Sequence, residues 1–223
     1  MKKLTLILLT MFGLVLFNSC KDDTDDNPQP AATNILNELK GYTGKTVEQI
    51  TETMQSKGFT LRNSESDIGM TNYSFINADS TSGYEFMEYE SKICIVSFNA
   101  YNNNNRDLLL STFETNSKSA ISFVSNTTFE YNSEIELSNS TEDSEQYPDR
   151  NSFLNAYNQN KNSIIYCYEN WMTADYIIGN EFNYEEDENE YYSLIGYGDL
   201  NLLPPFVSTK KSNNKSIFEM FHK

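Results

Sequence analysis

The sequence predicts an α+β fold, a single domain of mostly antiparallel sheet with about three helices packed on one face. Two observations predict it. Helical segments begin near Thr46, Arg106 and Asp149, and strand-like segments follow each of them. Residues 34–207 are also numerous enough for one hydrophobic core, and their apolar runs are strand-sized. We therefore assign the globular domain to residues 34–207.

The helices are predicted from their ends and their spacing. Thr46 and Gln49 stand three residues apart, as in a capping box, and Gly58 ends the helix that follows. A short helix precedes it and ends at Gly41. Further helices are expected over residues 106–116 and after Asp149 as a cap.

Strands are predicted where apolar and β-branched residues recur with a period of two. Both faces of Ser91–Tyr101 are apolar, which indicates a central strand. The full set of expected strands is Phe59–Arg62, Asn72–Asn77, Tyr84–Glu90, Ser91–Tyr101, Ala120–Val124, Thr127–Leu137, Ser163–Tyr168, Thr173–Ile178 and Tyr191–Tyr197. The first helix-and-strand unit, from Gly44 to Thr60, resembles small periplasmic lipoprotein modules of the β-lactamase-inhibitor-like and PepSY-like types. That resemblance implies helices on one face of an antiparallel sheet.

The N-terminus has the pattern of an export signal. Lys2 and Lys3 precede an apolar run from Leu4 to Phe17, which is shorter than a membrane-spanning helix requires. The residues that end the run, Phe17-Asn18-Ser19-Cys20, resemble a bacterial lipobox. The resemblance implies a lipoprotein signal peptide over residues 1–19 and acylation of Cys20. The alternative is an ordinary cleaved signal peptide with a chance cysteine.

The residues after that cysteine indicate a location. Lys21, Asp22 and Asp23 resemble the surface-export signal at the start of many Bacteroidetes lipoproteins. This resemblance implies a lipid-anchored protein of the outer membrane that faces the cell surface. The alternative is that the charged residues are only a soluble spacer. Residues 20–33 are too polar to bury apolar surface, so we expect a disordered tether.

Charge and motifs exclude several classes of function. The formal net charge of −16 disfavours nucleic acid as a partner, because phosphate backbones require Lys and Arg. No glycine-rich phosphate loop occurs, so we expect neither a nucleotide nor another cofactor. The membrane is expected to be a partner only through the lipid.

No catalytic residue and no metal site can be assigned from the sequence. The single histidine, His222, lies in a polar and basic tail, residues 208–223, which is either a frayed end or a docked final helix. The chain has 32 acidic residues, so a pair of carboxylates carries little specificity. The densest acidic run, Glu185–Glu190, lacks the spacing of a calcium loop and is expected to be an exposed hairpin loop.

Aromatic residues give the best candidates for a binding surface. Many of the 15 tyrosines lie in the C-terminal third, and Tyr168, Trp171 and Tyr176 are the candidate ligand-binding aromatics. The alternative is that strand alternation turns half of them into the core. Asp79-Ser80-Thr81 resembles a short O-glycosylation acceptor of the same bacterial group, which implicates Ser80.

Cys94 and Cys167 remain once Cys20 carries lipid. Both lie in apolar, strand-like segments, which indicates two buried free thiols, and the alternative for an even pair in an oxidising compartment is a disulfide. The sequence as a whole favours a non-enzymatic binding module for protein or glycan. The alternatives are a small carboxylate-dependent hydrolase and a periplasm-facing inhibitor or accessory module.

Overall fold

A computed structural model describes residues 33–67, 69–102, 105–138, 144–185 and 190–205 of the chain. The helices are α2 (Thr33–Lys40), α3 (Val47–Ser56), α4 (Arg106–Val124) and α5 (Arg150–Asn160), with a 3₁₀ turn η1 at Lys161–Ser163. The strands are β1 (Phe59–Asp67), β2 (Met70–Asn77), β3 (Ser82–Tyr89), β4 (Lys92–Tyr101), β5 (Glu130–Leu137), β6 (Glu145–Tyr147), β7 (Ile164–Met172), β8 (Tyr176–Glu185) and β9 (Glu190–Asp199).

All nine strands belong to one antiparallel sheet, in the order β1-β2-β3-β4-β9-β8-β7-β5-β6. Two meanders, β1–β4 and β7–β9, meet where β4 pairs with β9 in the middle of the sheet. Short connections explain the meanders, because antiparallel neighbours can be joined by tight turns. The predicted α+β class is confirmed, and so is the central position of the strand over residues 91–101.

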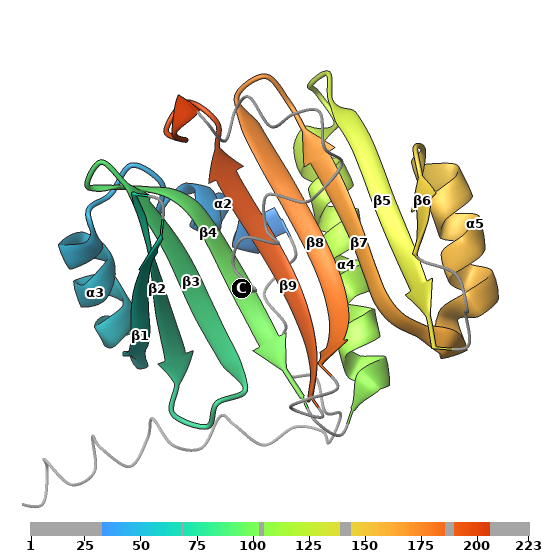
Figure 1. The fold of residues 1–223 in the computed structure, drawn as a ribbon, viewed down its shortest axis with the longest axis horizontal. Coiled ribbons are helices and arrows are strands. Elements are labelled where there is room, and N and C mark those ends of the chain that lie inside the picture. The colour runs from blue at the N-terminus through green and yellow to red at the C-terminus, as the bar shows by residue number, and fades with distance from the viewer. Residues whose placement is uncertain (1–32, 68, 103–104, 139–143, 186–189, 206–223) are drawn as a thin grey trace, which may run out of the picture.

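The helices cover one face of the sheet. Figure 1 shows α2 and α4 behind the middle strands, α3 beside β1 and α5 beside β6. Two apolar clusters lie between the helices and the sheet. One joins α2, α3 and the end of α4 to β2, β3, β4 and β9, and the other joins α4 and α5 to β5, β7 and β8. Among the described residues, no helix is long and apolar enough to cross a membrane.

Helix ends follow the expected chemistry. The backbone N–H of Thr46 donates to Gln49 Oε1 at 3.1 Å, which is the reciprocal half of the predicted capping box. Asp149 Oδ1 accepts from the N–H of Ser152 at 3.0 Å at the start of α5. Asn105 caps α4 in the same way by accepting from the N–H of Leu108 at 3.0 Å.

The prediction of a strand at Ala120–Val124 is wrong. These residues form the last turns of α4, and Ala120 and Val124 are fully buried on the same helix face as Phe113. Their spacing of four and seven residues continues the helical stripe, so tertiary packing favours one long helix. The three-residue strand β6 has no counterpart among the predicted elements.

Several predicted features lie outside the described residues. They are Cys20 with Lys21, Asp22 and Asp23, the tether, the acidic loop residues 186–189, and residues 206–223 with His222. The two strands that flank the acidic loop do form a hairpin, since Glu185 of β8 is opposite Glu190 of β9.

Candidate functional site

The sheet face opposite the helices is the candidate functional site, and we call it the helix-free face. It is turned toward the viewer in Figure 1. Strand alternation assigns its residues, because those opposite each other in register share a face. Its apolar cluster contains no helix residue: Met70, Met87, Cys94, Ile95, Ile177, Tyr192, Leu194 and Leu203. Polar side chains lie beside this cluster in the middle strands.

A hydrogen-bonded network joins β8 and β9 on this face. The hydroxyl of Tyr192 donates to Glu181 Oε1 at 2.7 Å, and Asn183 Nδ2 donates to that hydroxyl at 3.0 Å. Glu181 is 3 % exposed and Tyr192 is 3 % exposed. A carboxylate so deeply buried requires partners, and the tyrosine hydroxyl provides a short charge-assisted one.

Two polar side chains of β4 extend the site on the next strand. Ser97 is 0 % exposed and Asn99 is 2 % exposed, yet Ser97 Oγ and Asn99 Oδ1 have no hydrogen-bond partner in the described structure. The amide nitrogen of Asn99 is used, because it donates to the Tyr101 hydroxyl at 3.1 Å. A buried polar atom without a partner costs about 1–3 kcal/mol, so these two atoms are available to a hydrogen-bonding ligand or to water.

Burial and charge also affect Tyr101. Desolvation, reinforced by the negative charge of Glu85, raises the pKa of Tyr101 to about 12. Its hydroxyl therefore stays protonated at neutral pH and can accept from Asn99 as well as donate.

Glycines leave the backbone of β8 and β9 bare in the middle of this face. Gly179 is directly opposite Gly196, and Gly198 lies opposite Ile177 on one side and Ile95 on the other. A Cβ on Gly198 would lie 3.0 Å from Ile177 Cγ2, so this position packs closely only without a side chain. The middle of the face therefore has no side chains at these glycines, and polar side chains lie around them.

The sequence-predicted aromatics do not form one patch. Trp171 is 0 % exposed and lies on the helix-covered face, where its ring packs edge-on against Tyr131 at 5.7 Å. Tyr176 lies on that same face and stacks on Tyr197. Only Tyr168 lies on the helix-free face, where it is 2 % exposed. Trp171 is therefore a core residue and is withdrawn as a ligand-binding candidate.

Of the two interpretations of the cysteine pair, the structure has the two buried free thiols and not the disulfide. Cys94 and Cys167 are both free and buried. Cys94 belongs to the apolar cluster of the helix-free face and Cys167 to the cluster under α4 and α5, so the sheet separates the two thiols. Burial raises the pKa of the Cys94 thiol to about 12 and that of Cys167 well above its usual value.

Ser80 lies in the exposed turn between β2 and β3, with a positive φ of 59°. Asp79 Oδ1 accepts from both the backbone N–H and the hydroxyl of Thr81, at 3.2 and 2.7 Å. The turn is thus held by its own side chains, and Ser80 is exposed. Glycosylation of Ser80 stays a prediction.

A second buried acid lies under the helices. Glu169 is 0 % exposed, accepts from the Tyr131 hydroxyl at 2.9 Å and faces Arg150 of α5 at 3.5 Å. Desolvation raises its pKa although Ser117, Tyr131 and Arg150 act in the opposite direction. Glu169 and Glu181 are the two buried acids among the described residues, and they lie on opposite faces of the sheet. They therefore do not form the facing pair that a carboxylate-dependent hydrolase requires.

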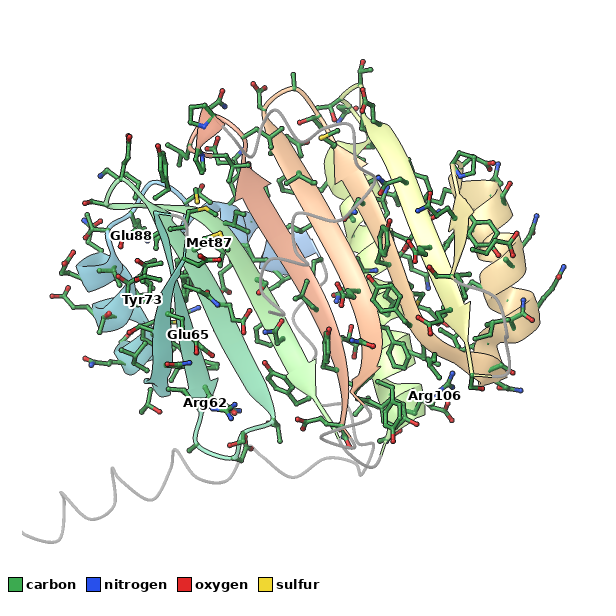
Figure 2. The ribbon with its side chains drawn as sticks, in the orientation of Figure 1. Arg62, Glu65, Tyr73, Met87, Glu88 and Arg106 are labelled. Atoms are coloured by element: carbon green, nitrogen blue, oxygen red, sulfur yellow. The ribbon has the colours of Figure 1, made fainter. Side chains whose placement is uncertain are left out.

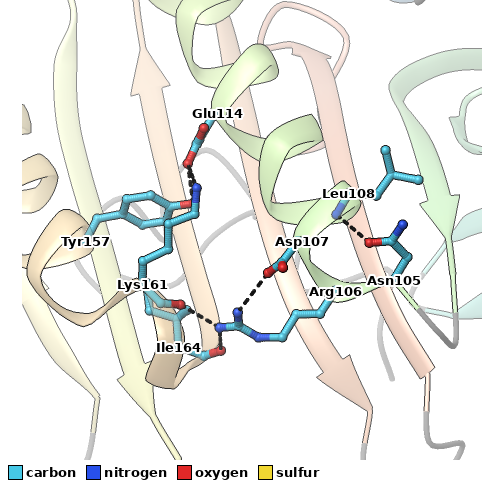
Figure 3. A network of polar contacts seen from close by, with 8 residues as sticks. All are labelled: Asn105, Arg106, Asp107, Leu108, Glu114, Tyr157, Lys161 and Ile164. Atoms are coloured by element: carbon cyan, nitrogen blue, oxygen red, sulfur yellow. Dashed lines mark hydrogen bonds and ion pairs between the residues drawn. The ribbon is translucent and has the colours of Figure 1, made fainter. Parts of the chain in front are cut away.

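Other polar clusters join secondary-structure elements. Arg106 donates to the carbonyl oxygens of Lys161 and Ile164 at 2.7 and 2.6 Å, and Glu114 pairs with Lys161 (Figure 3). These contacts tie α4 to η1 and to the first residue of β7. At the other end of the sheet, labelled in Figure 2, the Tyr73 hydroxyl donates to Glu88 Oε2 at 3.0 Å. Each of these groups has its partner within the fold, which is typical of a structural role.

Metal ligands do not gather in the described part of the chain, where no group of three His, Cys, Asp or Glu residues could hold an ion. Comparisons with protein-family models, with curated proteins and with solved structures found no match to this chain. The site is therefore interpreted from its own chemistry.

Sequence reasoning missed Ser97, Asn99, Glu181 and Tyr192. A signal for the first two is present, because Ser97 and Asn99 interrupt the apolar pattern of a central strand at alternate positions on one face. Polar residues at such positions are buried polar groups, which require a partner.

Proposed function

We propose that this protein is a lipid-anchored lipoprotein of the cell envelope whose domain is a non-enzymatic binding module for protein or glycan, with the helix-free face as the binding surface. One observation carries the choice of surface. Ser97 Oγ and Asn99 Oδ1 are buried acceptors without a partner, on a face that no described helix covers.

The chemistry of the face supports a polar ligand. Buried amide, hydroxyl and carboxylate oxygens of Asn99, Ser97 and Glu181 accept hydrogen bonds from hydroxyl or amide donors. Tyr101, Tyr168 and Tyr192 add rigid rings, which suit contacts with sugars and peptides. A ligand that donates to the unpartnered oxygens removes their desolvation cost, and that gain favours binding.

Binding is tested by probing a glycan array and a peptide array with residues 21–223 and with residues 21–205. We expect a ligand class whose signal falls at least about tenfold in Asn99→Ala, which corresponds to ~1.4 kcal/mol. The matched control is Asn160→Ala, on the far end of α5, which should leave the signal unchanged. Failure of both proteins to bind any glycan or peptide would count against the proposed function.

Anchoring is supported by the lipobox resemblance at Cys20 and is tested separately. Fatty-acid labelling should be lost in Cys20→Ser, and protease should reach the domain on intact cells. Full protection from protease would place the domain in the periplasm and contradict surface display.

A further inference from the structure

The middle of the helix-free face is as buried as the core, although the described helices all lie on the other side of the sheet. Leu194 and Ser97 are 0 % exposed, and Glu181 is 3 % exposed. The described residues that pack on this face from outside the sheet are few, Leu200, Leu202 and Leu203 at one end. Something beyond these residues therefore belongs on the middle of the face.

The chain itself turns onto this face after β9. The N–H of Leu200 donates to the carbonyl of Asp175 at 2.8 Å, and the N–H of Leu202 donates to that of Asp199 at 3.1 Å. Leu203 is then 7 % exposed within the apolar cluster of the helix-free face. The described chain thus stops at residue 205 on this face, at the end of the sheet where β9 finishes.

The remaining residues, 206–223, have the reach to cover the face. An extended chain of that length spans up to about 60 Å, whereas a ten-residue strand such as β9 is about 33 Å long. A segment that starts beside Leu203 can therefore run along the whole of β9.

The composition of the segment also fits. It carries four lysines, and the face presents Glu85 and Glu181 on β3 and β8. It also carries apolar residues that match Leu194, Met87 and Ile95: Ile217, Phe218, Met220 and Phe221. Burying a Phe side chain against such a surface contributes about 1.5–3 kcal/mol, so the segment gains stability from packing there.

We propose that residues 206–223 are the occupant of the helix-free face, held there by lysine–glutamate attraction and apolar packing. The segment supplies donors near the unpartnered oxygens of Ser97 and Asn99. An external ligand of the same face has to displace the segment, so the segment regulates binding. This consequence rests on the proposed function.

The test introduces a thiol in the middle of the face with Ser97→Cys, in a Cys94→Ala background, and compares residues 21–223 with residues 21–205. We expect maleimide labelling at position 97 to be at least about tenfold faster in the shorter chain, because a cover worth ~1.4 kcal/mol already gives that factor. Cys167, buried under α4 and α5, is the internal control and should stay unlabelled in both. Equal labelling rates in the two chains would overturn the proposal.

If Cys167 is also labelled in the shorter chain, truncation has unfolded the domain, and a second measurement then tests the proposal. A zero-length carbodiimide crosslinker joins lysines to carboxylates in contact, and it is applied to the intact residues 21–223. We expect crosslinks from Lys210, Lys211 or Lys215 to Glu85 or Glu181. Crosslinks from those lysines to acids of the helices alone, or none at all, would overturn the proposal.

The array experiment distinguishes this proposal from the proposed function. Loss of array binding in both chains, with labelling as expected, would reject the external ligand while keeping the segment on the face.

Discussion

Replacing Glu169 by glutamine should change how the stability of this domain depends on pH. Glu169 lies on β7 under the helices, with its Oε1 bound by the Tyr131 hydroxyl at 2.9 Å and Arg150 at 3.5 Å. Asn180 lies directly opposite on β8 and, with Ser117 and Tyr131, favours the ionised carboxylate, but burial outweighs them. Protonation of Glu169 removes its buried charge.

The direction of the effect follows from the raised pKa of Glu169, whose main cause is burial. The folded state holds this proton more tightly than the unfolded state. The stabilising contribution is therefore complete below the unfolded pKa of about 4.5 and is lost as pH rises through the folded value. Each unit by which the pKa is raised corresponds to ~1.4 kcal/mol of that loss.

Glutamine keeps the acceptor for Tyr131 and is neutral at every pH, so Glu169→Gln never carries the cost of a buried charge. We expect the free energy of unfolding of Glu169→Gln minus that of the wild type to increase as pH rises above about 4.5. Glu169→Ala removes the acceptor and leaves Tyr131 and Arg150 facing a cavity, with an expected loss of about 3 kcal/mol.

The assay is urea denaturation of residues 21–223 at several pH values between 4 and 8, with the slope of the transition checked for constancy. The matched control is Glu136→Gln, an exposed acid on the neighbouring strand β5, which should follow the wild-type profile. A stability difference between Glu169→Gln and the wild type that stays flat with pH, or shrinks as pH rises, would refute the reasoning.

Three further predictions concern stability and reactivity. Cys94 and Cys167 should react with a thiol reagent only as fast as the domain opens, because both are buried and their pKa values are raised; rapid labelling of the native protein would contradict this. Asp149→Ala should lower the free energy of unfolding by ~1 kcal/mol in urea denaturation, because α5 loses its N-cap, whereas Asp149→Asn should lose less. Gly83→Ala should lower the free energy of unfolding by about 1–3 kcal/mol, because the new Cβ would lie 2.9 Å from the carbonyl oxygen of Phe75. An unchanged thermal midpoint would contradict this, since it would mean that β2 and β3 can shift apart without cost.

Local patterns were sufficient for most elements of the fold. The apolar residues on both faces of residues 91–101 predicted a central strand, and β4 indeed pairs with β3 on one side and β9 on the other. The pairing of Val96 with Tyr197 joins residues far apart in the chain, and no local pattern encodes it. The strand order could therefore not be predicted from periodicity alone.

The segment Ala120–Val124 illustrates a different limit. A short apolar run fits a buried strand and a helix end equally well. The choice depends on whether the preceding helix continues, and here Phe113, Ala120 and Val124 share one buried helix face. Contacts with the sheet, which the sequence does not display, decided between the two.

The candidate site was harder to predict than the fold. Trp171 was chosen for its side-chain type, and type does not say which face of a strand meets the helices. Alternation does place Tyr168 and Trp171 on opposite faces, but both faces of β7 carry large residues. Only the positions of α4 and α5 show that the Trp171 face is the core.

Hydrogen-bond satisfaction, together with the face of the sheet on which a group lies, separates structural polar groups from candidates for binding. Glu38 Oε1 accepts from Tyr42, Tyr84 and Lys57 at 2.9, 2.6 and 2.7 Å, so three donors within the fold stabilise this carboxylate. Although burial opposes it, these donors lower the pKa of Glu38, as expected of a carboxylate stabilised in place. Ser97 and Asn99 are more deeply buried and still have oxygens without a donor. Because a fold gains nothing by burying such atoms alone, their partner is expected from outside the described residues, either the segment 206–223 or a ligand that replaces it.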